Sequence, residues 1–324
     1  MSKIITVLSK IPNLKNELGR ILPNLKFVQI DNGSARDEDL LLSSEIIVAD
    51  ADLFVPYLYQ TKSVKWVQMT WAGLDVIYKH ESYKGGDLPY LVTRFSGEHF
   101  GRIMSEYVIA SIVNHERSMF QVKLNQTKHC WNKSGSIQNY RIISDLTFGI
   151  LGLGQISSLV AQNLNLLGGN LICLGRSNRN SFPSFINKYY TTENLNEFLS
   201  NCDYVINVLP STKETIGLLN NDVLKHCAKR SAVFINIGRG SIIAENDLIN
   251  ALNNKWISGA ILDVFELEPL PKESPLWDMP QVLITPHVSG TSRAKDIAEQ
   301  FAKNYELYCS ESKIPTTVDF STGY

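Results

Sequence analysis

Three residues in the last third of the chain have side chains that together could bind a small acid and move a proton. They are Arg239, Glu268 and His287, and each stands at the end of an apolar run of strand type. An arginine can bind a carboxylate through two parallel N–H bonds. A histidine transfers protons near neutral pH, and a neighbouring carboxylate favours its charged form. The sequence therefore predicts a site that holds a carboxylate and delivers a proton.

A glycine turn upstream of these residues indicates a nucleotide site. The apolar run 148–151 leads into Gly152-x-Gly154-x-x-Ser157, and a helical pattern follows. Gly152 permits a tight turn, and Gly154 lets the backbone approach a pyrophosphate at the start of a helix. Serine replaces the usual third glycine, and an ordinary strand-to-helix turn is the alternative interpretation. The residues expected to bind the dinucleotide here are Gly152, Gly154, Gln155 and Ile156.

The next apolar run predicts which nicotinamide dinucleotide is bound. An NAD site has an acidic residue about 20 residues after the glycines, where it binds the ribose hydroxyls. Gly175 stands at that position, and Arg176, Ser177 and Arg179 follow it. Guanidinium and hydroxyl groups suit a 2′-phosphate, and no carboxylate repels it. We expect NADPH to be preferred, with NADH as the alternative if both arginines are solvated loop residues.

Several separated motifs occur in a fixed order and carry a resemblance to a known family. They are Gly152-x-Gly154, Asn207-Val-Leu-Pro210, Gly238-Arg-Gly240, Asp263-Val-Phe-x-x-Glu-Pro269 and Pro286-His287. With them the chain resembles the D-isomer-specific 2-hydroxyacid dehydrogenases over nearly its whole length. Met104-Ser-Glu-Tyr-Val108 and Gly175-Arg-Ser177 are similar to segments of the glyoxylate/hydroxypyruvate reductase branch.

The resemblance implies a catalytic role for each of the three residues. Arg239 would bind the substrate carboxylate and polarise the keto oxygen. His287 would protonate that oxygen as hydride arrives from the nicotinamide, and Glu268 would orient His287 and favour its charged form. Standing alone, each would more often be an ion-pair, loop or structural residue. Glu266 lies nearby, but Glu268 directly precedes Pro269, as in the family motif.

The resemblance also implies further contacts to cofactor and substrate. Asp263 would accept a hydrogen bond from the nicotinamide carboxamide, with turn capping as its alternative role. The other residues implied to contact the cofactor are Leu209 and Pro210. Backbone N–H groups of Trp71, Ala72 and Gly73 would bind the substrate carboxylate. Trp71 is bulky there, and either narrows the pocket toward two- or three-carbon acids or packs between domains.

Apolar runs of strand length alternate with helical stretches, which predicts parallel sheets flanked by helices. The first predicted unit has strands at 4–8, 26–30, 45–49, 64–70 and 89–93 and helical stretches at 13–22, 37–43, 52–59 and 74–80. The second has strands at 147–151, 170–175, 204–209, 232–237, 258–262 and 282–285, and a helix at about 292–309 returns to the first. The expected class is α/β, with two doubly wound parallel-sheet domains. A Rossmann cofactor domain, 98–290, is inserted in a flavodoxin-like substrate domain, 1–97 plus 291–324, and substrate is expected between them.

Residues 98–124 have few helix breakers and many apolar positions, which predicts one long helix. Such a helix is either buried within its own domain or buried partly against a second subunit. From the resemblance and this apolar surface we expect a homodimer.

Composition excludes several other classes of protein. The 324 residues suggest about two domains, and the net charge of −1 argues against broad nucleic-acid or membrane binding. The five cysteines are dispersed without a CxxC pair, so we expect reduced thiols and no metal site. The N-terminal apolar run 4–8 is too short for a signal core or a membrane span, and a cytoplasmic location is expected.

The main hypothesis is an NADPH-preferring reductase of glyoxylate, hydroxypyruvate or a similar small 2-keto acid. One alternative is another branch of the same family, such as 3-phosphoglycerate dehydrogenase. A different class is a nucleotide-sensing, non-enzymatic protein, since the transcriptional corepressors of this fold also keep the arginine, glutamate and histidine.

Overall fold

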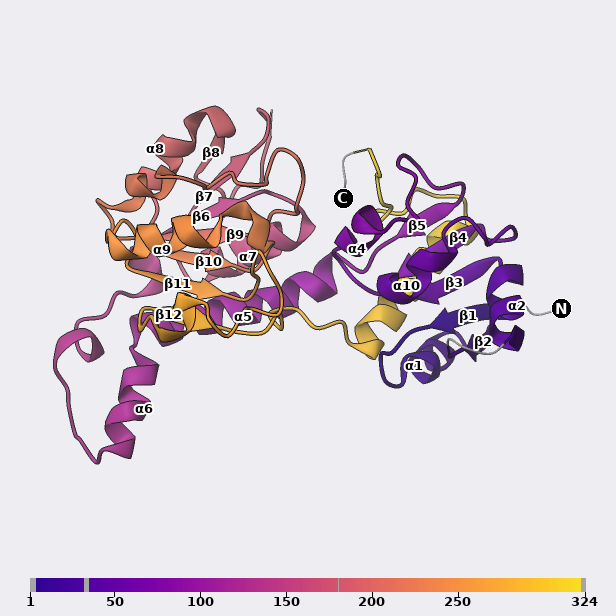
Figure 1. Ribbon diagram of the computed structural model, residues 1–324, viewed down its shortest axis with the longest axis horizontal. Helices are drawn as coiled ribbons and strands as arrows, with labels where there is room; N and C mark the ends of the chain where they lie inside the picture. The colour runs from indigo at the N-terminus through magenta and orange to yellow at the C-terminus, as the bar shows by residue number, and fades with distance from the viewer. Residues whose placement is uncertain (1–3, 32–34, 180, 322–324) are drawn as a thin grey trace. The chain divides into compact units, whose positions relative to one another are not determined.

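The computed structural model describes residues 4–31, 35–179 and 181–321. The chain divides into two compact units (Figure 1). Unit 1 combines residues 1–100 with 291–324, and unit 2 comprises residues 101–290.

Unit 1 is built on a five-stranded parallel sheet in the order β2-β1-β3-β4-β5. Its strands are β1 (Ile4–Leu8), β2 (Lys26–Gln29), β3 (Ile46–Ala49), β4 (Trp66–Met69) and β5 (Leu91–Thr93). Its helices are α1 (Leu14–Ile21), α2 (Ala35–Ser43), α3 (Ala51–Phe54), α4 (Asp75–Lys79) and α10 (Ala294–Cys309). This strand order is the flavodoxin-like one. The predicted strands and the returning helix of this unit are confirmed.

The apolar runs become strands because helices cover this sheet and leave little of it in water. Every residue of β3 and β4 is buried, as is typical of parallel sheets covered on both faces. Helix α10 contributes Phe301, whose ring stacks on Trp66 with centroids 5.1 Å apart. The last helix of the chain is thereby part of the core of unit 1.

Unit 2 is built on a seven-stranded parallel sheet in the order β12-β11-β10-β9-β6-β7-β8. Its strands are β6 (Thr147–Leu151), β7 (Asn170–Gly175), β8 (Lys188–Thr191), β9 (Tyr204–Asn207), β10 (Val233–Asn236), β11 (Gly259–Leu262) and β12 (Val282–Ile284). Helices α7 (Gln155–Leu166), α8 (Leu195–Ser200) and α9 (Glu245–Asn253) lie between strands. The order is that of the Rossmann fold with one strand added, so the predicted fold class is confirmed.

Strand β8 was not predicted from the sequence. It is an edge strand of sequence Lys-Tyr-Tyr-Thr, in which only Tyr190 is fully buried. An edge strand needs no continuous apolar run, because one side of it faces solvent. The only signal in the sequence was the β propensity of two tyrosines and a threonine.

The prediction of one helix over 98–124 is wrong. Helix α5 (Glu98–Glu116) ends where the Glu116 carboxylate accepts hydrogen bonds from Arg141 and Tyr204, at 2.6 and 2.7 Å. Ser118 then has a left-handed backbone, with φ of 50°, and a separate helix α6 (Met119–Thr127) begins. No glycine or proline marks this break, so a pattern of apolar residues could not reveal it.

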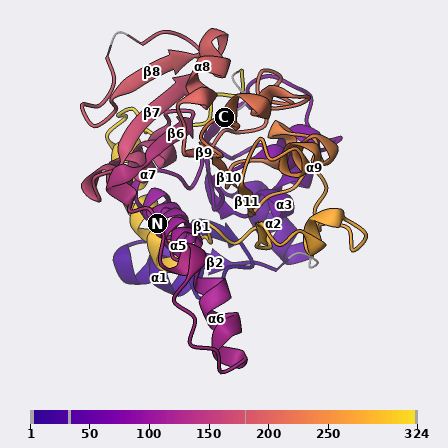
Figure 2. The same ribbon diagram turned by 90° about the vertical axis from the view of Figure 1, so that its left-hand side faces the viewer.

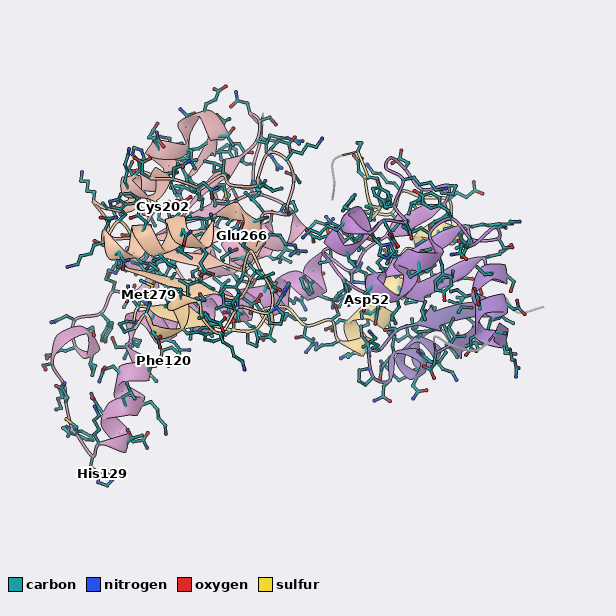
Figure 3. All side chains as sticks on the ribbon, in the orientation of Figure 1. Asp52, Phe120, His129, Cys202, Glu266 and Met279 are labelled. Atoms are coloured by element: carbon teal, nitrogen blue, oxygen red, sulfur yellow. The ribbon has the colours of Figure 1, made fainter. Side chains whose placement is uncertain are left out.

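Helix α6 and the segment that returns from it, residues 118–140, form an arm. Figures 1 and 2 show α6 extending away from the sheet of its own unit. No residue of α6 is buried, and Phe120 and His129, labelled in Figure 3, lie on this arm. The arm therefore contributes nothing to the core of unit 2.

Two further observations concern membrane association and cysteines. No helix in the described part of the chain combines the length and apolar character needed to cross a bilayer. All five cysteines are free, and Cys173, Cys202 and Cys227 are buried in unit 2. Burial raises the pKa of the Cys173 thiol to about 12, so this cysteine packs as a small apolar residue.

The buried carboxylate of Asp50 joins the carboxyl ends of three strands of unit 1. It follows β3 and is 2% exposed. It accepts hydrogen bonds from the Ser9 hydroxyl at 2.6 Å and the Lys10 N–H at 2.7 Å, both after β1. It also accepts from the Thr70 hydroxyl at 2.5 Å, directly after β4. Asp50 therefore fixes the start of the loop that contains Trp71.

Asp50→Ala should destabilise unit 1, because it leaves buried donors unpaired. Hydrogen bonds to a charged group are worth about 1.5–3 kcal/mol each, so we expect a loss of about 3 kcal/mol or more. The measurement is the thermal unfolding midpoint followed by circular dichroism. The control is Asp52→Ala, which removes a solvent-exposed pair with Lys10 and should cost less than about 1 kcal/mol. Equal midpoints for the two variants would contradict the role of Asp50.

Candidate active site

The turn between β6 and α7 has the geometry of a dinucleotide-binding turn. Gly152 has φ of +86°, and a Cβ there would lie 2.7 Å from Cδ2 of Leu209, so only glycine fits. Gly154 precedes α7, and its N–H donates to the Ser157 hydroxyl at 2.7 Å. That hydroxyl donates back to the Gly154 carbonyl at 3.2 Å. Ser157, which stands in place of the third glycine, therefore closes the turn. Helix α7 begins at this turn, so the positive end of the helix dipole faces the turn.

The segment after β9 lies beside this turn. Strands β6 and β9 are neighbours, while β7 continues the sheet on the other side of β6, so the strand order reverses here. Ligands of open α/β sheets bind at such a switch point. Asn207 accepts from the Leu209 N–H at 3.1 Å and donates to Asn236 at 2.8 Å, which joins the ends of β9 and β10. The Pro210 carbonyl accepts from the Thr215 hydroxyl at 2.6 Å.

The residues predicted to bind a 2′-phosphate follow β7 and are exposed. Nη2 of Arg179 donates to the Leu153 carbonyl at 3.1 Å, so this segment folds back onto the glycine turn. The Ser177 carbonyl accepts from the hydroxyl of Tyr189 at 3.3 Å. The pKa of Glu214 is lowered, first by a hydrogen bond from Thr212 and also by the charge of Arg176. Arg176 therefore lies within electrostatic reach of the loop after β9.

Arg239 is half-buried at the end of β10 and held by the polar residues around it. Its Nη1 donates to the Gly238 carbonyl at 2.7 Å, and its own carbonyl accepts from Asn236 at 3.2 Å. A Cβ on Gly240 would lie 1.9 Å from the carbonyl carbon of Phe265, so the two backbones are in direct contact. The loop that carries Arg239 therefore packs on the loop that carries Glu268.

Glu268 and His287 form a hydrogen-bonded pair. Oε2 of Glu268 lies 2.7 Å from Nδ1 of His287, and Oε1 accepts from the Phe265 N–H at 2.9 Å. A carboxylate accepts, so Nδ1 carries the hydrogen, and Nε2 is left to exchange a proton with a ligand. The His287 side chain is 51% exposed, which leaves it accessible.

The buried carboxylate of Asp263 holds the turn on which His287 stands. It is 0% exposed and accepts from the Thr285 hydroxyl at 2.5 Å, Val288 N–H at 2.8 Å and Ser289 N–H at 2.9 Å. The hydroxyls of Tyr107 and Thr285 are 2.7 Å apart. Asp263 thus caps this turn, and its proposed bond to the nicotinamide carboxamide stays a prediction. The roles of Thr285 and Tyr107 were missed, although Tyr107 belongs to the motif Met104–Val108.

The three predicted catalytic residues follow β10, β11 and β12, which are adjacent in the sheet. The predicted substrate residues Trp71, Ala72 and Gly73 follow β4 of unit 1. The Trp71 carbonyl accepts from the Phe95 N–H at 3.1 Å, and the Ala72 carbonyl accepts from Nη1 of Arg94 at 3.3 Å. The Trp71 side chain packs against the hydrophobic core of unit 1. Substrate binding by this loop stays a prediction.

Among the described residues, His99, Asp296 and Glu299 are close enough to share a cation. Nδ1 of His99 faces Asp296 at 3.8 Å, whereas Nε2 faces Glu299 at 3.7 Å. Asp296 also forms an ion pair with Arg293. A cation binds only one ring nitrogen, so the arrangement suits an imidazole held between two carboxylates better than a metal centre.

Comparisons with known proteins agree with this geometry. The model of the D-isomer specific 2-hydroxyacid dehydrogenase NAD binding domain matches residues 109–289. A family protein from Aeromonas salmonicida subsp. salmonicida A449 shares 30% identity over 99% of this chain and 100% of its own, with a TM-score of 0.84. A family protein from Xanthobacter autotrophicus Py2, solved with NADPH and MES, shares 26% identity over 100% of both chains, with a TM-score of 0.83.

A third solved structure carries a more specific description. It is an NADPH-dependent glyoxylate/hydroxypyruvate reductase from Sinorhizobium meliloti, in complex with NADP and sulfate. It shares 27% identity over 100% of both chains, with a TM-score of 0.83. The family expected from the sequence is confirmed: the chain belongs to the D-isomer specific 2-hydroxyacid dehydrogenases, and it is an NAD(P)-dependent enzyme of that family.

Proposed function

We propose that this enzyme reduces a small 2-keto acid, of the glyoxylate and hydroxypyruvate class, to the D-2-hydroxy acid with NADPH. The observation that carries the proposal is the pair of Glu268 and His287, 2.7 Å apart, beside the loop of Arg239 in a dinucleotide-binding unit. The similarity to the Sinorhizobium meliloti reductase supports the choice of substrate class.

The residues of unit 2 fit a nicotinamide dinucleotide. Gly152 and Gly154 bring the backbone and the start of α7 to the switch point of the sheet, where a pyrophosphate is stabilised. When bound, NADPH supplies the hydride that the carbonyl carbon receives. The exposed segment from Arg176 to Arg179 offers two guanidinium groups and a hydroxyl for a 2′-phosphate, and no carboxylate precedes it at position 175.

The protein's own groups then supply the proton and the charge stabilisation. Arg239 binds the carboxylate of the acid and polarises its keto oxygen. Nε2 of His287 donates a proton to that oxygen, which becomes the hydroxyl of the product. Glu268 keeps Nδ1 as a donor, orients the ring and balances the positive charge of the imidazolium.

His287→Ala should reduce the rate of keto acid reduction by about 10²–10⁴-fold, because it removes the general acid. Since only the charged imidazole carries the proton, wild-type reduction should slow as pH rises, and the residual rate of the variant should lose this dependence. The measurement is NADPH absorbance with glyoxylate, hydroxypyruvate and pyruvate across pH. The control is His226→Ala, a histidine outside the site. Near-full activity of His287→Ala would refute the assignment of His287 as the general acid. If the wild type binds NADPH tightly but turns over no keto acid, the protein is instead a nucleotide sensor.

Arg176→Ala should weaken NADPH binding far more than NADH binding. A hydrogen bond to a charged group is worth about 1.5–3 kcal/mol, so we expect the Michaelis constant for NADPH to rise by about 10- to 100-fold. Lys229→Ala removes an exposed charge elsewhere in unit 2 and serves as the control. Equal effects of Arg176→Ala on the two cofactors would contradict the phosphate role.

We propose that the arm pairs two copies of the chain into a homodimer. Apolar side chains are exposed on α6, and Trp131 on the returning segment is 90% exposed. The exposed apolar residues of α6 are Met119, Phe120, Val122 and Leu124. Several exposed large apolar side chains on one segment are typical of an interaction site.

The double substitution Phe120→Asp and Leu124→Asp should therefore produce a monomer. Light scattering after size-exclusion chromatography measures the mass. Since neither residue is buried, the fold of unit 2 should persist, as circular dichroism would show. The control is Leu166→Asp, whose leucine is 77% exposed at the end of α7. A wild-type protein that is already monomeric, or a variant that stays dimeric, would reject this interface.

A further inference from the structure

We propose that Tyr189, on the edge strand β8, is a determinant of cofactor preference. It keeps an acidic side chain out of position 175 and also positions the residues that face the 2′-phosphate. The inference rests on the proposed preference for NADPH and names the residue whose position would produce that preference.

The first observation is steric and concerns the space next to Gly175. A Cβ at Gly175 would lie 1.7 Å from the hydroxyl oxygen of Tyr189 and 2.7 Å from Cζ of its ring. Gly175 is not among the described glycines with positive φ, so its backbone does not itself demand glycine. In its observed position the neighbouring tyrosine therefore blocks any larger residue, including the aspartate or glutamate that would bind a ribose diol.

The second observation is that Tyr189 is held in place by several contacts. Its ring stacks on Phe182, with centroids 5.7 Å apart and planes 17° apart. Its hydroxyl donates to the Ser177 carbonyl at 3.3 Å. The guanidinium of Arg179 lies over the ring, 5.9 Å from its centroid. Moving the tyrosine aside to admit a side chain at position 175 would break these contacts together.

The third observation is that the same contacts order the phosphate-facing segment. Tyr189 contacts Ser177 and Arg179, and Arg179 also donates to the Leu153 carbonyl in the glycine turn. Tyr189 thus joins β8 to the segment after β7, and Arg179 joins that segment to the turn after β6. In this inference, exclusion of the acid and placement of the cationic segment both depend on Tyr189.

The test compares the wild type with Gly175→Asp, Tyr189→Ala and the double variant. Dissociation constants for NADPH and NADH are measured by fluorescence titration without a keto acid. Gly175→Asp alone should weaken both cofactors, because the new side chain meets Tyr189. The double variant should recover NADH binding and lose NADPH binding, since a carboxylate now faces the ribose. We expect its ratio of the two constants to shift by about 10- to 100-fold relative to the wild type.

Two further variants make the comparison more specific. Tyr189→Phe removes only the hydroxyl. Because Cζ would still lie 2.7 Å from the new Cβ, this substitution should restore little NADH binding to Gly175→Asp. Lys188→Ala changes the preceding residue of β8, which pairs with Glu197, and should leave the ratio unchanged. If Gly175→Asp fails to fold, as judged by its thermal midpoint, Gly175→Ala with and without Tyr189→Ala tests the same clash through loss and recovery of NADPH binding.

The outcomes separate this inference from the function on which it rests. If Gly175→Asp alone binds NADH as well as the double variant does, Tyr189 is no barrier and the inference is wrong. If the wild type binds NADPH and NADH equally, the proposed cofactor preference fails, and with it the role of Tyr189 in setting it. If the wild type prefers NADPH and the double variant prefers NADH, but the wild type reduces no keto acid, the substrate proposal fails and this inference stands.

Discussion

The buried carboxylate of Asp263 is the interaction on which the geometry of the proposed active site depends. It follows β11 and receives two backbone N–H groups and a hydroxyl from the segment after β12. That segment includes His287, whose backbone has a left-handed φ of 53° and which must be held there by its surroundings. With this turn fixed, the imidazole reaches Glu268, and one nitrogen is left for a ligand. The buried Asp263 carboxylate with its three donors therefore fixes the orientation of the turn, while Glu268 and His287 stay exposed for the proposed proton transfer.

Close backbone approach brings the remaining groups to the same edge of the sheet. Gly240 packs on the backbone at Phe265, and a Cβ at Gly238 would lie 2.7 Å from the Leu209 carbonyl. Gly152 differs, because it meets only the end of the Leu209 side chain and has φ of +86°. At Gly238 and Gly240 a side chain would push two loop backbones apart. Gly238 and Gly240 therefore act through the distance between loops, whereas Gly152 supplies a backbone conformation that other residues rarely adopt.

Much of the fold and of the candidate site could be predicted from the sequence, for a physical reason. In a parallel sheet covered on both faces, strands such as β3 and β4 are buried throughout, and their apolar runs are visible without coordinates. The residues after such strands, including Arg239, Glu268 and His287, are then expected at one edge. Features that depend on a few polar contacts between residues distant in the sequence could not be predicted. Helix α5 ends where Glu116 accepts hydrogen bonds from Arg141 and Tyr204, and the local pattern of apolar residues does not indicate these contacts.

Strand β8 illustrates the same limit, with a consequence for function. The sequence showed that position 175 lacks an acid, but it could not show why, because Tyr189 lies on an edge strand without an apolar run. Absence of a carboxylate alone would allow a surface that merely tolerates either cofactor. An aromatic side chain that occupies the space of a Cβ at position 175 and contacts Ser177 and Arg179 is a stronger constraint. If Tyr189 keeps this position, as we propose, a side chain at position 175 is unfavourable whatever its charge, and a change of cofactor would require both positions to change together.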